Sequence, residues 1–135
     1  AWAISGIVAF GITALIFAFF PTYVNRPVLD GQGWDWDLLR FVYSNDNVYN
    51  ALPSLHISTT FWLTLFYARW YPRSRWVFWG VFVVVVLSTL FTRQHYILDV
   101  LAGMAMAGSA YIFGWWASRK LEARATQRVA EPAMN

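Results

Sequence analysis

The sequence predicts an all-α integral membrane protein: a bundle of four transmembrane helices, with a short interfacial helix in an outer loop. Of its 135 residues, 59% are hydrophobic and 13% are charged, whereas about a quarter of the residues of a soluble domain are charged. Aromatic residues make up 20%, which suits a protein with many Trp and Tyr side chains at membrane interfaces. The chain has no cysteine, which excludes a small secreted module held by disulfides.

The first apolar segment covers 2–20, and its polar side chains are Ser5 and Thr13. At the helical rise it spans roughly 28 Å, close to the thickness of the hydrocarbon core. Three further apolar segments follow, at about 52–68, 76–91 and 96–118. The last of them contains one charged residue, Asp99. We expect each of the four segments to form a transmembrane helix.

The long connection 21–51 is predicted to contain a short helix. Residues 34–44 read WDWDLLRFVYS, which places Leu38 and Val42 at helical spacing. An amphipathic stretch of this kind is expected to lie at the membrane interface. The Ser-Asn-Asp-Asn sequence at 44–47 is typical of a turn and should end this helix.

The distribution of basic residues predicts the orientation. Seven of the ten basic residues lie in two stretches, after the second and after the fourth segment: Arg69, Arg73, Arg75, Arg119, Lys120, Arg124 and Arg128. The positive-inside rule places both stretches in the cytoplasm, so the loop 21–51 and the turn 92–95 face outward. The chain then divides into a transmembrane domain, 1–118, and a cytoplasmic basic tail, 119–135, which we expect to be a frayed extension of the last helix. Because topology accounts for most of the positive charge, no nucleic-acid partner is expected.

The two histidines fall at the outer ends of their segments. His56 lies at the start of the second segment and His95 at the start of the fourth, so both are expected at one membrane surface. Asp99 follows His95 by four residues and should share its helix face. A carboxylate inside a membrane segment is costly and is usually functional. It would orient the imidazole and make it more basic, and such a histidine can act as a nucleophile.

Groups that suit a phosphate ligand are predicted on the same surface. Arg26 follows the first segment and Arg93 precedes His95 by two residues. Guanidinium groups offer paired donors to phosphate oxygens. Pro53 in the first turn of a helix would leave free N–H groups at its positive end, and Ser54 adds a hydroxyl.

These residues together predict a phosphoryl-transfer site. His95 would attack phosphorus, Asp99 would hold His95, and His56 would protonate the leaving oxygen as a general acid. Three groups would stabilise the phosphoryl oxygens, namely Arg26, Arg93 and Ser54. Simpler roles remain open for these three: anchoring a helix end, reaching to the headgroups and capping a helix.

Three stretches resemble the signature motifs of the type 2 phosphatidic acid phosphatase (lipid phosphate phosphatase) superfamily. They are PTYVNRP at 21–27, ALPSLH at 51–56 and TRQHYILDVLAG at 92–103. The common forms of these motifs are KxxxxxxRP, PSGH and SRxxxxxHxxxD. The resemblance covers about residues 10–116. It implies the phosphohistidine mechanism, no metal or other cofactor, and a six-helix fold of which these four helices form part.

The departures from the motifs indicate one branch of that superfamily. Phe19, Leu55 and Thr89 stand where the common motifs have lysine, glycine and arginine. This pattern is similar to the branch that contains inositol phosphorylceramide synthase and related lipid phosphotransferases.

The sequence leaves three functions open. The first is a phosphatase that hydrolyses a phosphomonoester or pyrophosphate of a lipid, at a bacterial inner membrane with the site facing outward. The second is a lipid phosphotransferase of the inositol phosphorylceramide synthase type, in which an alcohol replaces water as the acceptor. The third is a non-enzymatic membrane protein that binds a metal or haem through His56, His95 and Asp99. The expected partners of the enzyme are a lipid phosphate and membrane lipids.

Overall fold

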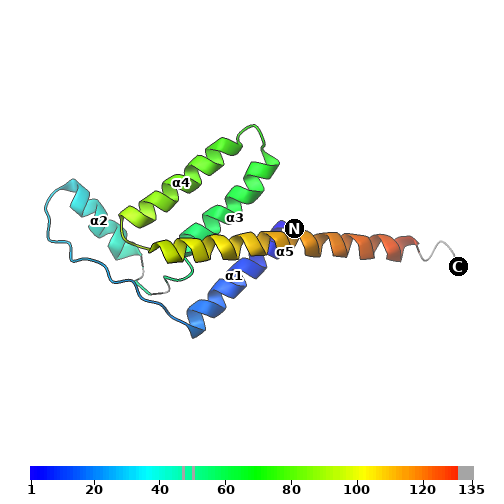
Figure 1. Cartoon of the computed structure of the whole chain (residues 1–135), viewed down its shortest axis with the longest axis horizontal. Helices are drawn as coiled ribbons and strands as arrows, with labels where there is room; N and C mark the ends of the chain where they lie inside the picture. The colour runs from blue at the N-terminus through cyan, green and yellow to red at the C-terminus, as the bar shows by residue number, and fades with distance from the viewer. Residues whose placement is uncertain (47, 50, 131–135) are drawn as a thin grey trace.

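The computed structural model describes residues 1–46, 48–49 and 51–130, and the side chains of all of these except 128–130. Within these ranges the chain forms five α-helices and no β-strand: α1 (Trp2–Phe19), α2 (Trp34–Asn45), α3 (Leu55–Trp70), α4 (Arg75–Phe91) and α5 (Ile97–Ala130) (Figure 1). The expectation of an all-α fold is confirmed for this part of the chain.

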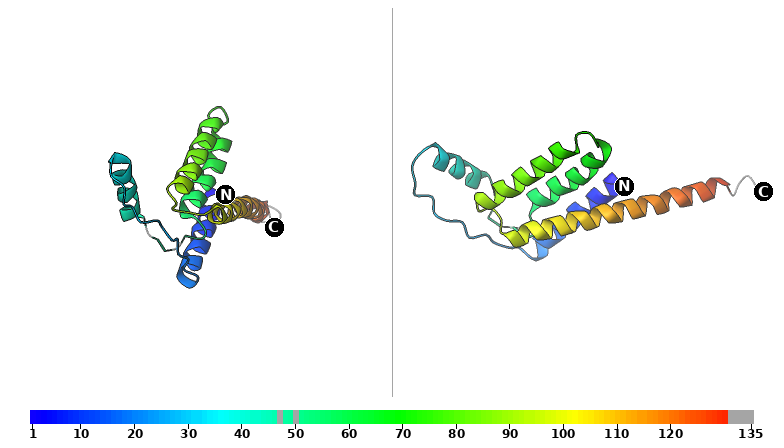
Figure 2. Two further views of the ribbon diagram at one scale, coloured as in Figure 1. Left: turned by 60° about the vertical axis from the view of Figure 1, so that its left-hand side comes forward. Right: turned by 45° about the horizontal axis from the view of Figure 1, so that its top comes forward.

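Four of the helices pack into one bundle, and α2 lies apart from it beside the end of α4 (Figure 2). α3 packs against both α4 and α5, and α1 packs along α5. α1 and α5 run antiparallel, because Thr13 lies against Met106 while Ser5 lies against Gly114. A Cβ at Gly114 would lie 2.6 Å from the Cβ of Ser5, so only glycine permits this approach.

α3 and α5 run parallel and begin at the same level. Just before α3, Ser54 N donates a hydrogen bond to the Asp99 carbonyl at 3.3 Å. Farther along, the rings of Phe66 and Tyr111 meet with centroids 4.8 Å apart. Gly103 allows the close approach, since a Cβ there would lie 3.0 Å from the Ser54 carbonyl oxygen. The N-terminal ends of these two helices are therefore held next to each other.

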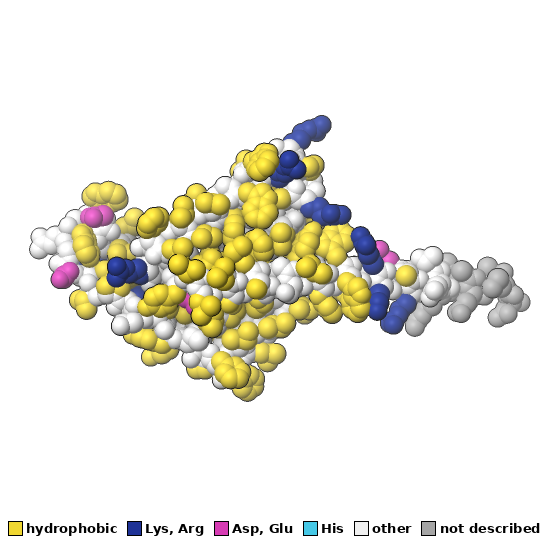
Figure 3. Space-filling model, in the orientation of Figure 1, with side chains coloured by type: hydrophobic (Ala, Val, Ile, Leu, Met, Phe, Trp, Pro, Cys, Tyr) yellow, Lys and Arg dark blue, Asp and Glu magenta, His cyan; other side chains and the backbone are white. Residues whose placement is uncertain are grey.

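The lengths of the helices support the membrane assignment for two of them. α1 and the stretch 97–127 of α5 are long and apolar enough to cross a membrane, and α4 is a shorter apolar helix. α3 has 16 residues. Large apolar side chains also cover the outside of the bundle (Figure 3), with Ile7 75% and Leu101 57% exposed. The prediction of four transmembrane helices is thus confirmed in part.

Basic side chains are concentrated toward one end of the molecule. Lys and Arg gather at the end that carries the α3–α4 turn and on the second half of α5, whereas acidic side chains appear around α2 (Figure 3). The apolar surface lies between these two ends.

The element boundaries confirm most of the sequence predictions and correct one. α2 coincides with the predicted short helix within one residue, and α5 continues without a break through 119–130. Pro53 was expected in the first turn of the second apolar helix, and this is wrong, because α3 begins at Leu55. Ser54 is the N-cap instead, as expected from the high preference of serine for that position. Pro53 precedes the cap and follows a cis peptide bond.

Candidate active site

The two histidines lie side by side at the N-terminal ends of α3 and α5. His56 is exposed in the first turn of α3, and His95 is buried in the turn before α5. Their ring centroids are 5.8 Å apart and the ring planes are inclined by 60°. The predicted mechanism requires α3 and α5 to be neighbours, and they are. At this separation both imidazoles can contact a single phosphoryl group.

Asp99 lies behind His95, as the four-residue spacing predicts. The distance between His95 Nδ1 and Asp99 Oδ2 is 3.7 Å, just beyond a hydrogen bond. The same Oδ2 accepts a hydrogen bond from Tyr96 N at 2.8 Å. Asp99 is therefore at the N3 position of α5 and bonds the N-cap residue, as the acid of a capping box does. This bond fixes the carboxylate beside an imidazole nitrogen that has no hydrogen-bond partner among the described residues.

The surroundings of His95 favour its neutral form. Burial lowers the pKa of His95 below its ordinary value of 6.5, and the neighbouring His56 lowers it further. Asp99 and Asp46, together with the backbone of Ala51, act in the opposite direction, but burial dominates. A neutral imidazole has the free electron pair that a nucleophile needs.

Arg93 lies two residues after the end of α4. Its backbone conformation is uncommon for a residue with a large side chain. Its φ is 51°, in the left-handed region that favours glycine. Arg93 N donates to the Leu90 carbonyl at 3.1 Å and Gln94 N to the Thr89 carbonyl at 3.0 Å. These two bonds define a Schellman motif, whose C′ position is usually glycine. A non-glycine residue costs about 1 kcal/mol there, which favours a functional reason for the arginine.

A cavity of about 380 Å³ opens beside this turn. Its lining residues are Asn25, Leu90, Arg93, His95, Tyr96 and Ile97. The cavity thus brings an exposed guanidinium and a buried imidazole together with apolar side chains from the ends of α4 and α5. This combination suits a phosphate group that is attached to an apolar chain.

Arg26 lies on the segment that follows α1, and its guanidinium is already paired. It forms an ion pair with the Asp46 carboxylate, and Nη1 donates to the Asp46 carbonyl at 2.9 Å. The guanidinium also lies 4.7 Å from the centre of the Tyr43 ring. The Arg26 side chain is only 7% exposed, so it is a fixed, buried cation. One of its donors, Nε, is buried without a partner in the described part of the chain.

Asp46 and Gln94 join Arg26 to the histidine turn, and the sequence analysis did not identify either of them as part of the site. Asp46 Oδ2 accepts from Gln94 Nε2 at 3.1 Å as well as from Arg26. Gln94 Oε1 in turn accepts from the Thr92 hydroxyl at 3.0 Å. The position of Gln94 between Arg93 and His95 was a signal for its role. Asp46 was interpreted only as a turn former, because no local pattern links it to Arg26.

Ser54 lies beneath the site rather than within the cavity. Its side chain is fully buried, and its hydroxyl accepts from Ile57 N at 3.3 Å. This is the capping role that the sequence analysis left open beside phosphate binding. Through its backbone bond to Asp99, Ser54 also holds the starts of α3 and α5 together.

The structure brings His56, His95, Asp99 and Arg93 to one place and connects Arg26 to them through Asp46 and Gln94. Nowhere in the described residues do three or more His, Cys, Asp or Glu side chains form a group that could hold a metal ion. The arrangement brings together two imidazoles, a carboxylate and an exposed guanidinium, which are groups that can serve phosphoryl transfer.

Comparisons with known proteins point in the same direction. The sequence model of the PAP2 superfamily matches residues 2–113. The chain is also 32% identical over 66 residues to the inositol phosphorylceramide synthase catalytic subunit aur1 of Schizosaccharomyces pombe (strain 972 / ATCC 24843). That alignment covers 49% of this chain and only 16% of the yeast protein. No solved structure matches the chain. Because the superfamily match extends over most of the sequence and includes both histidines, the chain belongs to the PAP2 superfamily.

Proposed function

We propose that this protein is a membrane enzyme that removes the phosphoryl group of a lipid phosphate through a phosphohistidine intermediate on His95. The observation that carries the proposal is the arrangement of three side chains. His56 and His95 have ring centroids 5.8 Å apart, and Asp99 lies 3.7 Å behind His95 Nδ1. The neutral state of His95 and the adjoining cavity with Arg93 support the same conclusion.

The proposed mechanism uses one nitrogen atom of each histidine. With Nδ1 facing Asp99, His95 keeps its Nδ1 proton and presents the Nε2 electron pair to phosphorus. The N–P bond forms while the bond from phosphorus to the lipid oxygen breaks, and protonated His56 donates its proton to that oxygen. In the second step neutral His56 removes a proton from water, the water oxygen attacks phosphorus, and the N–P bond breaks. Phosphate is released and both histidines return to their starting states.

Arg93 and Arg26 have different parts in this scheme. Arg93 is exposed on the cavity and would bind the phosphoryl oxygens directly. Arg26 is buried and paired with Asp46, so it would add positive potential and hold Asp46 near the site. Ser54 would act through helix capping, with the phosphate approaching the N-terminal end of α3 above it.

A lipid phosphotransferase is the second candidate, and the similarity to inositol phosphorylceramide synthase favours it. The first step would be the same in kind, but the intermediate would be resolved by an alcohol on a second lipid. The active site would face outward in a bacterial inner membrane, with residues 1–118 as the enzymatic domain and 119–135 as a cytoplasmic tail. The third candidate, a metal- or haem-binding protein, would leave Arg93 without a role at the site.

The test is phosphate release in detergent micelles from a panel of lipid phosphates, with and without EDTA, for the wild type and His95→Ala. Release that resists EDTA and is lost in the variant is expected. Absence of release from every lipid, together with head-group transfer from a diester donor to a lipid alcohol, would establish the transferase instead. Release that EDTA abolishes would support the metal-binding alternative and contradict the proposal.

Orientation is tested separately, because the native chain has no cysteine. Ser44 on α2 and Ser74 before α4 are both exposed, so Ser44→Cys and Ser74→Cys provide one label site on each side. A membrane-impermeant thiol reagent added to intact cells should label position 44 alone. Labelling of position 74 alone would reverse the assignment.

A further inference from the structure

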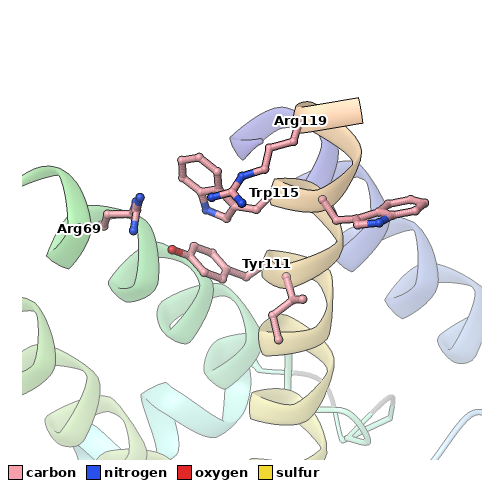
Figure 4. Close-up of a pocket in the computed structure, with 6 residues that line it drawn as sticks. Arg69, Tyr111, Trp115 and Arg119 are labelled. Carbon is pink, nitrogen blue, oxygen red and sulfur yellow. The ribbon is translucent and has the colours of Figure 1, made fainter. Parts of the chain in front are cut away.

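We infer that the end of the molecule opposite the histidines carries a second binding site, for the phosphate group of an anionic lipid. The site is a cavity of about 340 Å³ between α3 and α5 (Figure 4). Its lining residues are Arg69, Tyr111, Ile112, Trp115, Trp116 and Arg119. Neither the proposed reaction nor the similarity to known proteins assigns a role to it.

The spacing of the α5 residues explains how the cavity forms. Tyr111, Trp115 and Arg119 follow one another at four-residue intervals and therefore share one helix face. Arg69, in the last turn of α3, faces them across the gap (Figure 4). The guanidinium of Arg69 lies 4.6 Å from the centre of a Trp115 ring, and the Tyr111 ring packs on Phe66. The aromatic wall is thus anchored in the core of the bundle.

The polar groups of the cavity favour an anion. Both charged residues in its lining are arginines, and neither of them forms an ion pair within the described chain. Trp115 Nε1 is a buried donor with no hydrogen-bond partner among the described residues, a state that is unfavourable unless a ligand accepts from it. Two planar cations and an unused N–H donor match the acceptor oxygens of a phosphate group.

The position of the cavity favours a lipid as the source of that phosphate. Trp115 is roughly 27 Å along α5 from Ile97, which lines the histidine cavity, so the two cavities lie about one hydrocarbon thickness apart. The cavity is therefore at the interface on the arginine-rich side of the bundle. Exposed Ile112 and Trp116 would contact the acyl chain. Basic pockets between helices at this level are known to bind anionic head groups.

The test measures lipid binding to the purified protein in neutral detergent by native mass spectrometry. The probes are phosphatidylglycerol, phosphatidylcholine with the same acyl chains, and inorganic phosphate. The wild type is compared with R69Q/R119Q and with a matched control, R73Q/R124Q. The control removes two cations from the same end of the molecule but from outside the cavity. Lipid that binds at the histidine site is common to all variants and cancels in the comparison.

We expect R69Q/R119Q to bind phosphatidylglycerol at least tenfold more weakly, while R73Q/R124Q binds it as the wild type does. R69K/R119K should recover part of the binding, and W115F should weaken it. An equal loss in both glutamine variants would overturn the proposal, because it would indicate general attraction to positive charge. If the wild type bound phosphatidylcholine as tightly as phosphatidylglycerol, the proposed selection for an anionic lipid would be overturned. Inorganic phosphate that displaces the lipid at similar concentration would identify a free-phosphate site and overturn the lipid assignment.

Discussion

Asp46 accepts a hydrogen bond from Gln94 at 3.1 Å with the same carboxylate oxygen that pairs with Arg26. One side chain thereby joins the segment after α1 to the turn that carries His95. The carboxylate also contributes to the electrostatic environment of that histidine. The Tyr43 hydroxyl adds a second connection, because it donates a hydrogen bond to the Thr92 carbonyl at 2.7 Å.

Asp46→Asn is expected to lower both stability and activity. It leaves the buried Arg26 cation without a compensating charge, and a lost hydrogen bond to a charged group costs about 2 kcal/mol. Asp37→Asn is the matched control, because the Asp37–Arg40 pair is exposed and should contribute less than about 1 kcal/mol. Thermal unfolding in detergent would compare the two variants. Equal losses of stability would contradict a special role for Asp46.

Arg93→Gly should change stability and activity in opposite directions. Glycine relieves the left-handed backbone strain at the Schellman position, which should stabilise the protein by up to about 1 kcal/mol. Loss of the guanidinium should reduce kcat/KM roughly 100-fold, as for other groups that stabilise transition-state charge. Arg93→Lys should keep part of the activity. Unchanged turnover in the glycine variant would reduce Arg93 to an interfacial anchor.

Gly103→Ala should separate the two histidines. The added Cβ would lie 3.0 Å from the Ser54 carbonyl and 3.1 Å from the Ser58 hydroxyl, so α3 and α5 must move apart, at a cost of about 1–3 kcal/mol. Gly108→Ala, whose Cβ would meet only Phe61 at 3.7 Å, provides the control and should behave like the wild type. Phosphate release and unfolding temperature are measured for both variants. Full activity in Gly103→Ala would show that the close approach is dispensable.

The depressed pKa of His95 predicts two pH effects. The unfolded chain binds a proton at the ordinary pKa of 6.5, whereas folded His95 binds it only at lower pH. Stability should therefore fall as pH decreases from above 6.5 to the folded pKa, because the unfolded state gains protons in that window. The value of kcat/KM should fall at the lower end of this window, around the folded pKa, because it follows the neutral fraction of His95 in the folded enzyme.

His95→Gln is the variant that tests the origin of this stability change, since it retains the polar shape without the titration. Its unfolding free energy should lose the decrease that the wild type shows below pH 6.5. Denaturant unfolding at a series of pH values gives the comparison. A decrease that persists in the variant would assign the effect to another group.

The local patterns predicted what local interactions decide. The long apolar runs predicted the bounds of α1 and α4 closely, because mean hydropathy and length are enough to identify such helices. The four-residue spacing of His95 and Asp99 correctly indicated that they face each other. The expectation that both histidines lie at the same membrane surface also placed His56 next to His95, as in the structure.

The sequence patterns did not predict the contacts made across the long connection 21–51. The pairing of Arg26 with Asp46 depends on how a loop of 20 residues closes, and composition does not encode this. The Schellman motif at Arg93 was not predicted either, because the glycine that usually marks its C′ position is replaced by arginine. For Pro53, two helix-start preferences competed, and the serine cap prevailed over proline in the first turn.

The parallel start of α3 and α5 has an electrostatic consequence. Each helix N-terminus carries about half an elementary positive charge, so two adjacent ones supply about one charge together. Phe19 and Thr89 carry no charge, whereas the two backbone dipoles add positive potential at this end of the bundle. Unlike charged side chains, the peptide groups that produce this field neither titrate nor change rotamer. This positive potential therefore belongs to the main chain and persists across the pH range in which the helices are folded.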